Sequence, residues 1–199
     1  MLIGVTGTIG AGKSVVATEL ARQLDVLLFD ADKQCRDLME PGEAGYRRIV
    51  ERWGTRFLSG DGSLDRDALA EAVFTDKKLR GQLENILHPL VRSRLLEVLP
   101  QGDQGAFVVA DIPLLFEAGW EHECDLIVCV VTDEKTAVSR VRNRDGRTVQ
   151  EVHNIMASQM PAADKAAMSD YVIDNSGTFE QTSRQVAQLS SAIKRAVKP

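Results

Sequence analysis

The first residues with clear chemical meaning form a glycine-rich segment near the amino terminus. It reads GTIGAGKS, from Gly7 to Ser14, and matches the pattern G-x-x-x-x-G-K-[ST] at every required position. Glycines allow main-chain N–H groups to converge on phosphate oxygens, and a helix starting there adds partial positive charge. In such a loop Lys13 reaches the β- and γ-phosphates, and the Ser14 hydroxyl is a ligand for Mg²⁺. The segment therefore predicts a nucleoside triphosphate site.

A dinucleotide site is the competing interpretation, because Asp30 lies where a ribose-binding acid would be expected after the glycines. The dinucleotide pattern G-x-G-x-x-G fails, however, since Val15 occupies the position of the third glycine. The pair Lys13 and Ser14 is instead typical of a triphosphate loop. The residues therefore favour a triphosphate site over a dinucleotide site.

Acidic residues follow two of the apolar segments. Asp30 and Asp32 come directly after the run 26–29, and Asp111 lies within the run 106–112. Ligands of open α/β sheets bind at the carboxyl ends of the strands. One carboxylate of the first pair can accept or orient the proton of an acceptor hydroxyl, and the other can cap the following helix. Asp111 is a candidate for contact with Mg²⁺ through water.

Residues 138–148 are rich in arginine, with four arginines and a single acid in a chain that is acidic overall. On a helix Arg140 and Arg144 are four positions apart and share one face, whereas Arg142 points elsewhere. Converging guanidinium groups can clamp phosphates and stabilise the charge of a transferring phosphoryl group. A solvated helical face is the alternative interpretation.

These residues must be positioned by regular elements, and the apolar pattern indicates which ones. A strand, the glycine turn, a helix at 13–24 and a second strand form a βαβ unit, which requires a parallel sheet. Near-continuous apolar character is typical of strands covered on both faces. The expected strands are 2–6, 26–29, 106–112, 126–131 and 171–173. The sequence thus predicts an α/β fold, a P-loop NTPase-type parallel sheet flanked by helices.

Segments with helical periodicity lie between the expected strands in the sequence. Segments 43–54, 65–74, 76–86 and 88–99 predict an α-helical insert, followed by a loop at 101–105. A second helical stretch predicts a lid. An enzyme that transfers a phosphoryl group needs a lid because water competes with the acceptor hydroxyl for that group. We therefore expect one kinase domain of the nucleoside-monophosphate-kinase-like type, with a core of about 1–33, 105–133 and 169–199, an insert of about 34–104 and a lid of about 134–168.

Composition narrows the function classes. With 24 basic and 29 acidic residues the net charge is −5, which disfavours a general binder of nucleic acid or of an anionic membrane. Three cysteines without C-x-x-C spacing indicate reduced thiols, and three histidines show no metal-ligand spacing. The longest apolar run, 126–131, is too short to span a bilayer, and no signal peptide is visible. We expect a cytoplasmic protein; no pattern indicates an oligomeric state.

Among triphosphate-binding proteins, the layout favours a small-molecule kinase. The guanine-recognition motif N-K-x-D of GTPases is absent from the sequence. A small α/β core with a helical insert and an arginine-rich segment is typical of kinases that act on small acceptors. A nucleotide-dependent regulatory switch remains an alternative from a different class, as does a kinase for another small acceptor.

Several segments taken together resemble the dephospho-CoA kinase family. Besides the phosphate loop they are FDADKQCRDLM, LENILHPLV, DIPLLFEAG, RVRNRDG and DYVIDNSG, and the resemblance covers essentially the whole chain. It implies ATP-dependent phosphorylation of the ribose 3′-hydroxyl of dephospho-CoA, giving coenzyme A and ADP in the last step of coenzyme A synthesis. The implied partners are ATP with Mg²⁺ and dephospho-CoA.

The resemblance also implies roles for individual residues. Asp32 matches the catalytic base and Asp30 its neighbour, while Lys13 and Arg140 would complete the catalytic group. His88 lies in the insert, which resembles the CoA-binding lobe, at an expected helix start, and is a substrate-site candidate. The ATP site would comprise Gly10, Ala11, Gly12, Lys13, Ser14, Val15, Arg144, Asn175, Ser176 and Gly177.

Overall fold

The computed structural model describes residues 1–99 and 107–197. The chain divides into two compact units, which we treat separately. Unit 1 comprises Met1–Asp30 and Leu99–Pro199, and unit 2 comprises Ala31–Val98. The loop expected at residues 101–105 lies outside the described residues.

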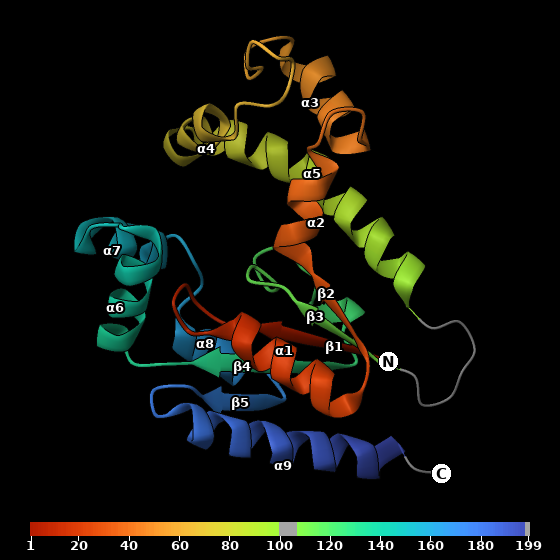
Figure 1. Cartoon of the computed structure of the whole chain (residues 1–199), viewed down its shortest axis with the longest axis vertical. Coiled ribbons are helices and arrows are strands. Elements are labelled where there is room, and N and C mark those ends of the chain that lie inside the picture. The colour runs from red at the N-terminus through yellow and green to blue at the C-terminus, as the bar shows by residue number, and fades with distance from the viewer. Residues whose placement is uncertain (100–106, 198–199) are drawn as a thin grey trace. The chain divides into compact units, whose positions relative to one another are not determined.

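Unit 1 is built on a parallel sheet of five strands in the order β2-β3-β1-β4-β5 (Figure 1). All four strand pairs are parallel, which confirms the expected fold class. The strands lie close to the expected ranges, although the second begins one residue later and includes Asp30. Their bounds are β1 (Leu2–Thr6), β2 (Leu27–Asp30), β3 (Val108–Asp111), β4 (Leu126–Val131) and β5 (Tyr171–Asp174).

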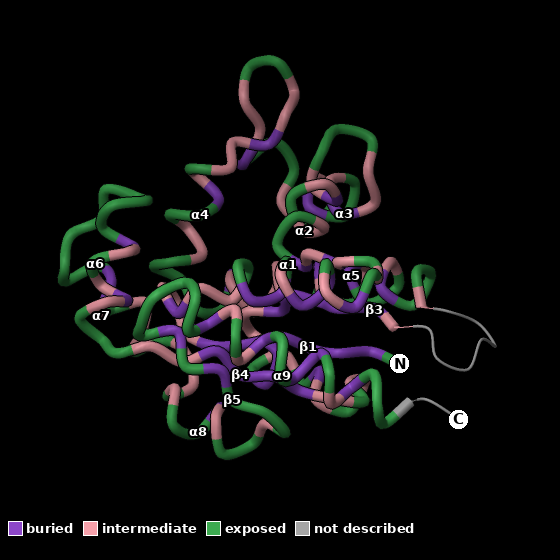
Figure 2. Tube along the Cα trace, turned by 60° about the horizontal axis from the view of Figure 1, so that its bottom comes forward, coloured by how far each residue is buried: buried purple, intermediate pink, exposed green. Residues whose placement is uncertain are grey.

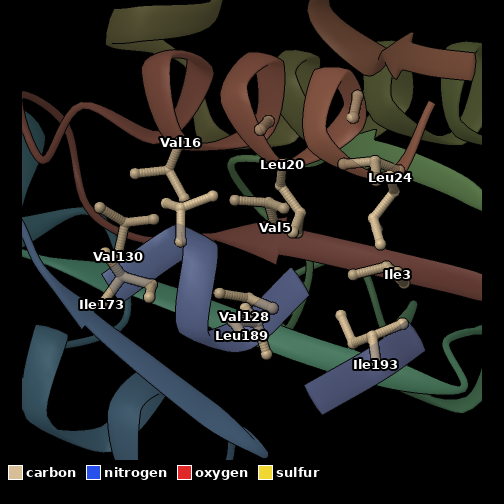
Figure 3. Packing of buried hydrophobic residues seen from close by; sticks show 14 of the residues in the cluster. Ile3, Val5, Val16, Leu20, Leu24, Val128, Val130, Ile173, Leu189 and Ile193 are labelled. Atoms are coloured by element: carbon tan, nitrogen blue, oxygen red, sulfur yellow. The ribbon is translucent and has the colours of Figure 1, made fainter. Parts of the chain in front are cut away.

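Helices α1 (Lys13–Leu24) and α9 (Phe179–Val197) pack together against one face of this sheet (Figure 1). The buried side of α1 carries Val16, Leu20 and Leu24 at helical spacing. Figure 3 shows these side chains directed toward the strands and toward α9. The resulting core fixes α1, whose first turn contains the last two residues of the phosphate loop. Its fully or nearly fully buried members include Ile3, Val5, Val128, Val130, Ile173, Leu189 and Ile193.

The central strands are buried on both faces, as their uninterrupted apolar sequences predict. All five residues of β1 are buried, and so are the four inner residues of β4 (Figure 2). The remaining elements of unit 1 follow β3 and β4 in the chain. They are η1 (Glu121–Glu123), α6 (Glu134–Asp145), α7 (Val149–Ala157) and α8 (Ala162–Ala167).

Unit 2 is helical and has a small core of its own. It contains α2 (Ala31–Leu38), α3 (Ala44–Trp53), α4 (Arg66–Thr75) and α5 (Lys77–Val98). The rings of Trp53 and Phe57 meet edge to face, with centroids 5.8 Å apart. Other buried members of this cluster are Ile49, Leu64, Leu69 and Leu79.

The expectation of two helices at 76–86 and 88–99 is wrong, because α5 continues through Pro89. His88 consequently lies inside a helix and not at a helix start. A proline in a helix interior costs roughly 3 kcal/mol. Leu87, Val91 and Leu95 repeat every four residues across it and are all buried, and each such side chain contributes about 1.5–3 kcal/mol. The free energy gained by burying these three side chains on one continuous face thus outweighs the cost of the proline.

In the part of the chain that the structure describes, no helix combines the length and apolar character that crossing a membrane requires. Cys35, Cys124 and Cys129 are all free thiols. Burial is the main cause that raises the pKa of Cys124 to about 12, so this thiol stays protonated at neutral pH.

Truncating Leu20 tests how far this core supports the loop. Leu20 is completely buried, so we expect Leu20→Ala to lower the free energy of unfolding by about 2–5 kcal/mol through lost burial and a residual cavity. Val172 is 45% exposed on β5, and the control Val172→Ala should cost less than about 1 kcal/mol. Urea titration followed by circular dichroism measures both; equal losses would contradict the packing described.

Candidate active site

The phosphate loop connects β1 to α1 by a backbone that only glycine adopts readily. Gly10 and Gly12 have φ values of 77° and 87°, in the left-handed region. A Cβ on Gly10 would lie 2.6 Å from the carbonyl oxygen of Ala137, and one on Gly12 would lie 2.1 Å from Nδ2 of Asn175. The loop is therefore pressed against α6 on one side and against the residue after β5 on another.

A cavity of about 230 Å³ opens at this loop. Most of the residues expected to bind ATP phosphates line it, together with Val141 of α6. Arg142 instead lines a separate cavity with His153. The two arginines expected on one helix face thus share this cavity. Its lining residues are Gly10, Gly12, Lys13, Ser14, Val15, Arg140, Val141 and Arg144.

Ser14 and Asp111 are joined by a short hydrogen bond. The Ser14 hydroxyl donates to Oδ2 of Asp111 across 2.6 Å, a length typical of a hydroxyl bound to a carboxylate. Asp111 is 5% exposed at the end of β3. The strand register places Asp30 directly beside it, at the end of β2. Two carboxylates and a hydroxyl therefore gather at the carboxyl edge of the sheet.

This donor set fits Mg²⁺, which prefers oxygen ligands and is held by one or two protein groups together with substrate phosphates. Among the described residues no three His, Cys, Asp or Glu side chains cluster in a way that could hold a metal by themselves. A metal at Ser14 and Asp111 would therefore depend on phosphate oxygens for much of its coordination.

Cationic groups surround the same cavity. The Lys13 ammonium donates to the carbonyl oxygen of Thr8 at 3.1 Å. Arg140 uses Nη2 to donate to the carbonyl oxygen of Asn175 at 2.9 Å. Its Nη1 is buried and has no hydrogen-bond partner within residues 1–99 and 107–197. A buried guanidinium N–H without an acceptor is unfavourable, and an anion in the adjoining cavity would satisfy it.

Arg144 forms an ion pair with the next residue in the chain, Asp145. Its Nε and Nη2 donate to the two carboxylate oxygens of Asp145 at 2.7 and 2.8 Å. This interaction holds the pKa of Asp145 below its usual value. The charge of Arg144 at the cavity is therefore partly offset.

Asn175 has a structural function that sequence reasoning missed. Its side chain is buried, donates from Nδ2 to the carbonyl oxygen of Ala11 at 2.8 Å, and accepts from the Thr182 hydroxyl at 2.8 Å. The side chain thus ties the phosphate loop to α9. The sequence separation of 164 residues between Asn175 and Ala11 leaves no local signal for this contact.

Ser176 and Gly177 do not line the phosphate-loop cavity. They line a second cavity of about 680 Å³ between β5 and α9, with Asp174, Gln181 and Arg184 among its other residues. The Ser176 hydroxyl accepts from the main-chain N–H of Asp133 at 3.1 Å. Their expected contact with adenine stays a prediction.

Asp32 and His88 belong to unit 2. Asp32 is exposed in the first turn of α2. His88 is half-buried in α5, and burial lowers its pKa, which favours a neutral imidazole at pH 7. Their assignments to the acceptor site stay predictions.

Known proteins resemble this chain over nearly its whole length. A family model described as dephospho-CoA kinase matches residues 1–181. A dephospho-CoA kinase of Shouchella clausii is 43% identical over 188 residues, covering 94% of this chain and 95% of the relative. Among solved structures, a protein from Thermus thermophilus has a TM-score of 0.81 at 33% identity, covering 96% of this chain and 97% of its own.

The dephospho-CoA kinase from Campylobacter jejuni has a TM-score of 0.68 at 25% identity, and the match covers 98% of both chains. Sequence and structure therefore agree over nearly the full length, phosphate loop included. The chain belongs to the dephospho-CoA kinase family.

Proposed function

We propose that this chain transfers the γ-phosphoryl group of ATP to the ribose 3′-hydroxyl of dephospho-CoA, giving coenzyme A and ADP. The observation that carries the proposal is the cavity at the phosphate loop, where Lys13, Ser14 and Arg140 meet and Ser14 is hydrogen-bonded to Asp111. Family membership supplies the identity of the acceptor.

Lys13 and Arg140 stabilise the charge that develops on the transferring group. Phosphoryl transfer requires little covalent chemistry from the protein, so positioning and charge neutralisation dominate. Lys13 lies at the first position of α1, so its ammonium adds to the partial positive charge of the helix terminus. The buried Nη1 of Arg140 receives a phosphate oxygen as its acceptor. Arg144 adds positive charge, partly offset by Asp145.

Ser14 and Asp111 would hold Mg²⁺ in this proposal, and the ion would supply neutralisation of charge on the β- and γ-phosphates. Asp111 contributes in addition by fixing the Ser14 hydroxyl through the 2.6 Å hydrogen bond.

Three residues are assigned to the acceptor site in this proposal. Asp32 accepts the proton of the 3′-hydroxyl, and Asp30 and His88 contribute to acceptor binding. The position of Asp32 in the first turn of α2, two residues after the strand that carries Asp30, supports this assignment. The segment 134–168 acts as the lid that keeps water from the γ-phosphoryl group.

A panel of acceptors tests the function. With ATP and Mg²⁺, ADP release should depend on dephospho-CoA and should be slow with adenosine, with a hexose and without acceptor. Mass spectrometry should find one added phosphoryl group on dephospho-CoA. Equal ADP release with and without acceptor would indicate a regulatory switch, and preference for a different acceptor would indicate another kinase.

Lys13→Ala should lower kcat by about 10²–10³-fold, because the loss of one charged donor in a water-poor site costs roughly 3–4 kcal/mol of transition-state stabilisation. Lys194→Ala is a matched control, since this lysine lies near the end of α9 and donates to the carbonyl of Gln23. Steady-state kinetics measure both. Near-normal turnover of Lys13→Ala would overturn the assignment of the loop.

Asp32→Asn should lower kcat at least about a hundredfold while ATP binding is retained, because the amide cannot accept the hydroxyl proton. Asp30→Asn is the matched comparison and should have the smaller effect. Kinetics together with calorimetric titration of an ATP analogue separate catalysis from binding. The reverse order of effects would assign the base to Asp30.

A further inference from the structure

A completely buried lysine, paired with a carboxylate that is 23% exposed, lies outside the phosphate-loop cavity. The side chain of Lys165 on α8 is 0% exposed, and its ammonium donates to Oε2 of Glu117 and to the carbonyl oxygen of Pro113, both at 2.9 Å. An ammonium is held in such a place only when it is paired and hydrogen-bonded. Neither Lys165 nor Glu117 lines the phosphate-loop cavity.

The pair is connected to the phosphate loop through the segment after α7. The other carboxylate oxygen of Glu117 accepts from the main-chain N–H of Met160 at 2.9 Å. The preceding residue, Gln159, accepts with its Oε1 from the main-chain N–H of Ile9, also at 2.9 Å. Ile9 lies in the middle of the loop. Glu117 therefore fixes the main chain at Met160, next to Gln159, whose side chain holds the Ile9 amide.

The orientation of the Ile9 amide affects Lys13. The N–H of Ile9 and the C=O of Thr8 belong to one planar trans peptide unit, so they point in opposite directions and rotate together. The Thr8 carbonyl oxygen accepts from the Lys13 ammonium at 3.1 Å and from the main-chain N–H of Ala11 at 3.2 Å. When Gln159 holds the N–H, it thereby also sets the direction of the carbonyl that holds Lys13.

Lys165 is also linked to the start of the loop through a second pair of hydrogen bonds. The Pro113 carbonyl that it contacts accepts from the hydroxyl of Thr6 at 3.2 Å. Thr6 is the last residue of β1, directly before the loop. The same buried ammonium is thus linked to the entry of the loop and, through Glu117, to its middle.

We propose that Gln159, held in place by the Glu117–Lys165 pair, is a positioning residue that orients the Thr8–Ile9 peptide and through it the Lys13 ammonium for the triphosphate. The inference concerns nucleotide binding directly and depends on the proposed function only for its effect on turnover. It assigns no contact with substrate to Gln159, Glu117 or Lys165.

The first test replaces Gln159. Gln159→Leu removes the acceptor at similar size, whereas Gln159→Glu keeps an oxygen at the same reach. For Gln159→Leu we expect the Kd of a non-hydrolysable ATP analogue with Mg²⁺ and the KM for ATP to rise about three- to tenfold, the size of one net hydrogen bond. The KM for dephospho-CoA and the Tm should stay near wild type, and Gln159→Glu should restore ATP binding to within about twofold.

Two results of this series would overturn the proposal. One is an unchanged Kd for the analogue in Gln159→Leu. The other is an equal loss in Gln159→Glu, since the acceptor would then not be what matters. The Kd needs no acceptor substrate, so these results remain readable even if the acceptor panel refutes the proposed function.

The second test separates positioning from stability. Glu117→Leu leaves the buried Lys165 ammonium without its partner and should lower the Tm strongly, whereas Lys165→Met leaves a carboxylate that is partly exposed and should lower it less. The double variant replaces the pair by apolar groups and should recover the Tm. We expect the double variant still to bind the ATP analogue more weakly, because nothing then holds the Met160 amide beside Gln159. A double variant with recovered Tm and wild-type Kd would show that the pair serves packing alone.

Discussion

The structure depends on holding several positive groups around one small cavity. Lys13, Arg140, Arg144 and the amino terminus of α1 all direct positive charge toward it. Such an arrangement repels itself, so it persists only if rigid surroundings fix each group. Carbonyl oxygens at Thr8 and Asn175 hold the first two cations, and the Asp145 carboxylate holds the third. A triphosphate bound as proposed would replace this repulsion by attraction at little cost in reorganisation.

The rigid surroundings are of two kinds. Below the loop, α1 is held between the sheet and α9 by a fully apolar cluster. Around the loop the contacts are polar and come from distant parts of the chain, through Asn175, Gln159 and the Ser14–Asp111 hydrogen bond. Apolar packing positions the helix, and the hydrogen bonds set the direction of individual peptide units. Both are required where a displacement of about 1 Å weakens catalysis.

The sequence predicted those parts of the fold and site that follow from local spacing. The glycine pattern located the loop, the four-residue spacing of Arg140 and Arg144 placed them on one side of a helix, and apolar runs located five parallel strands. It failed where tertiary contacts decide. Pro89 was expected to end a helix, but buried residues on either side carry α5 through it. The contacts of Asn175 and Gln159 with the loop join residues 150 or more positions apart, which no local pattern can indicate.

The strand order also bears on how the chain reaches this state during synthesis. β1 leaves the ribosome first, yet it occupies the middle of the sheet, and both of its neighbours lie more than 100 residues downstream. Residues 31–98 emerge in between and make mainly local contacts, which form early. The apolar surface of the nascent β1–α1 segment therefore stays exposed until β3 and β4 have been synthesised. Chaperones can bind this surface during that period.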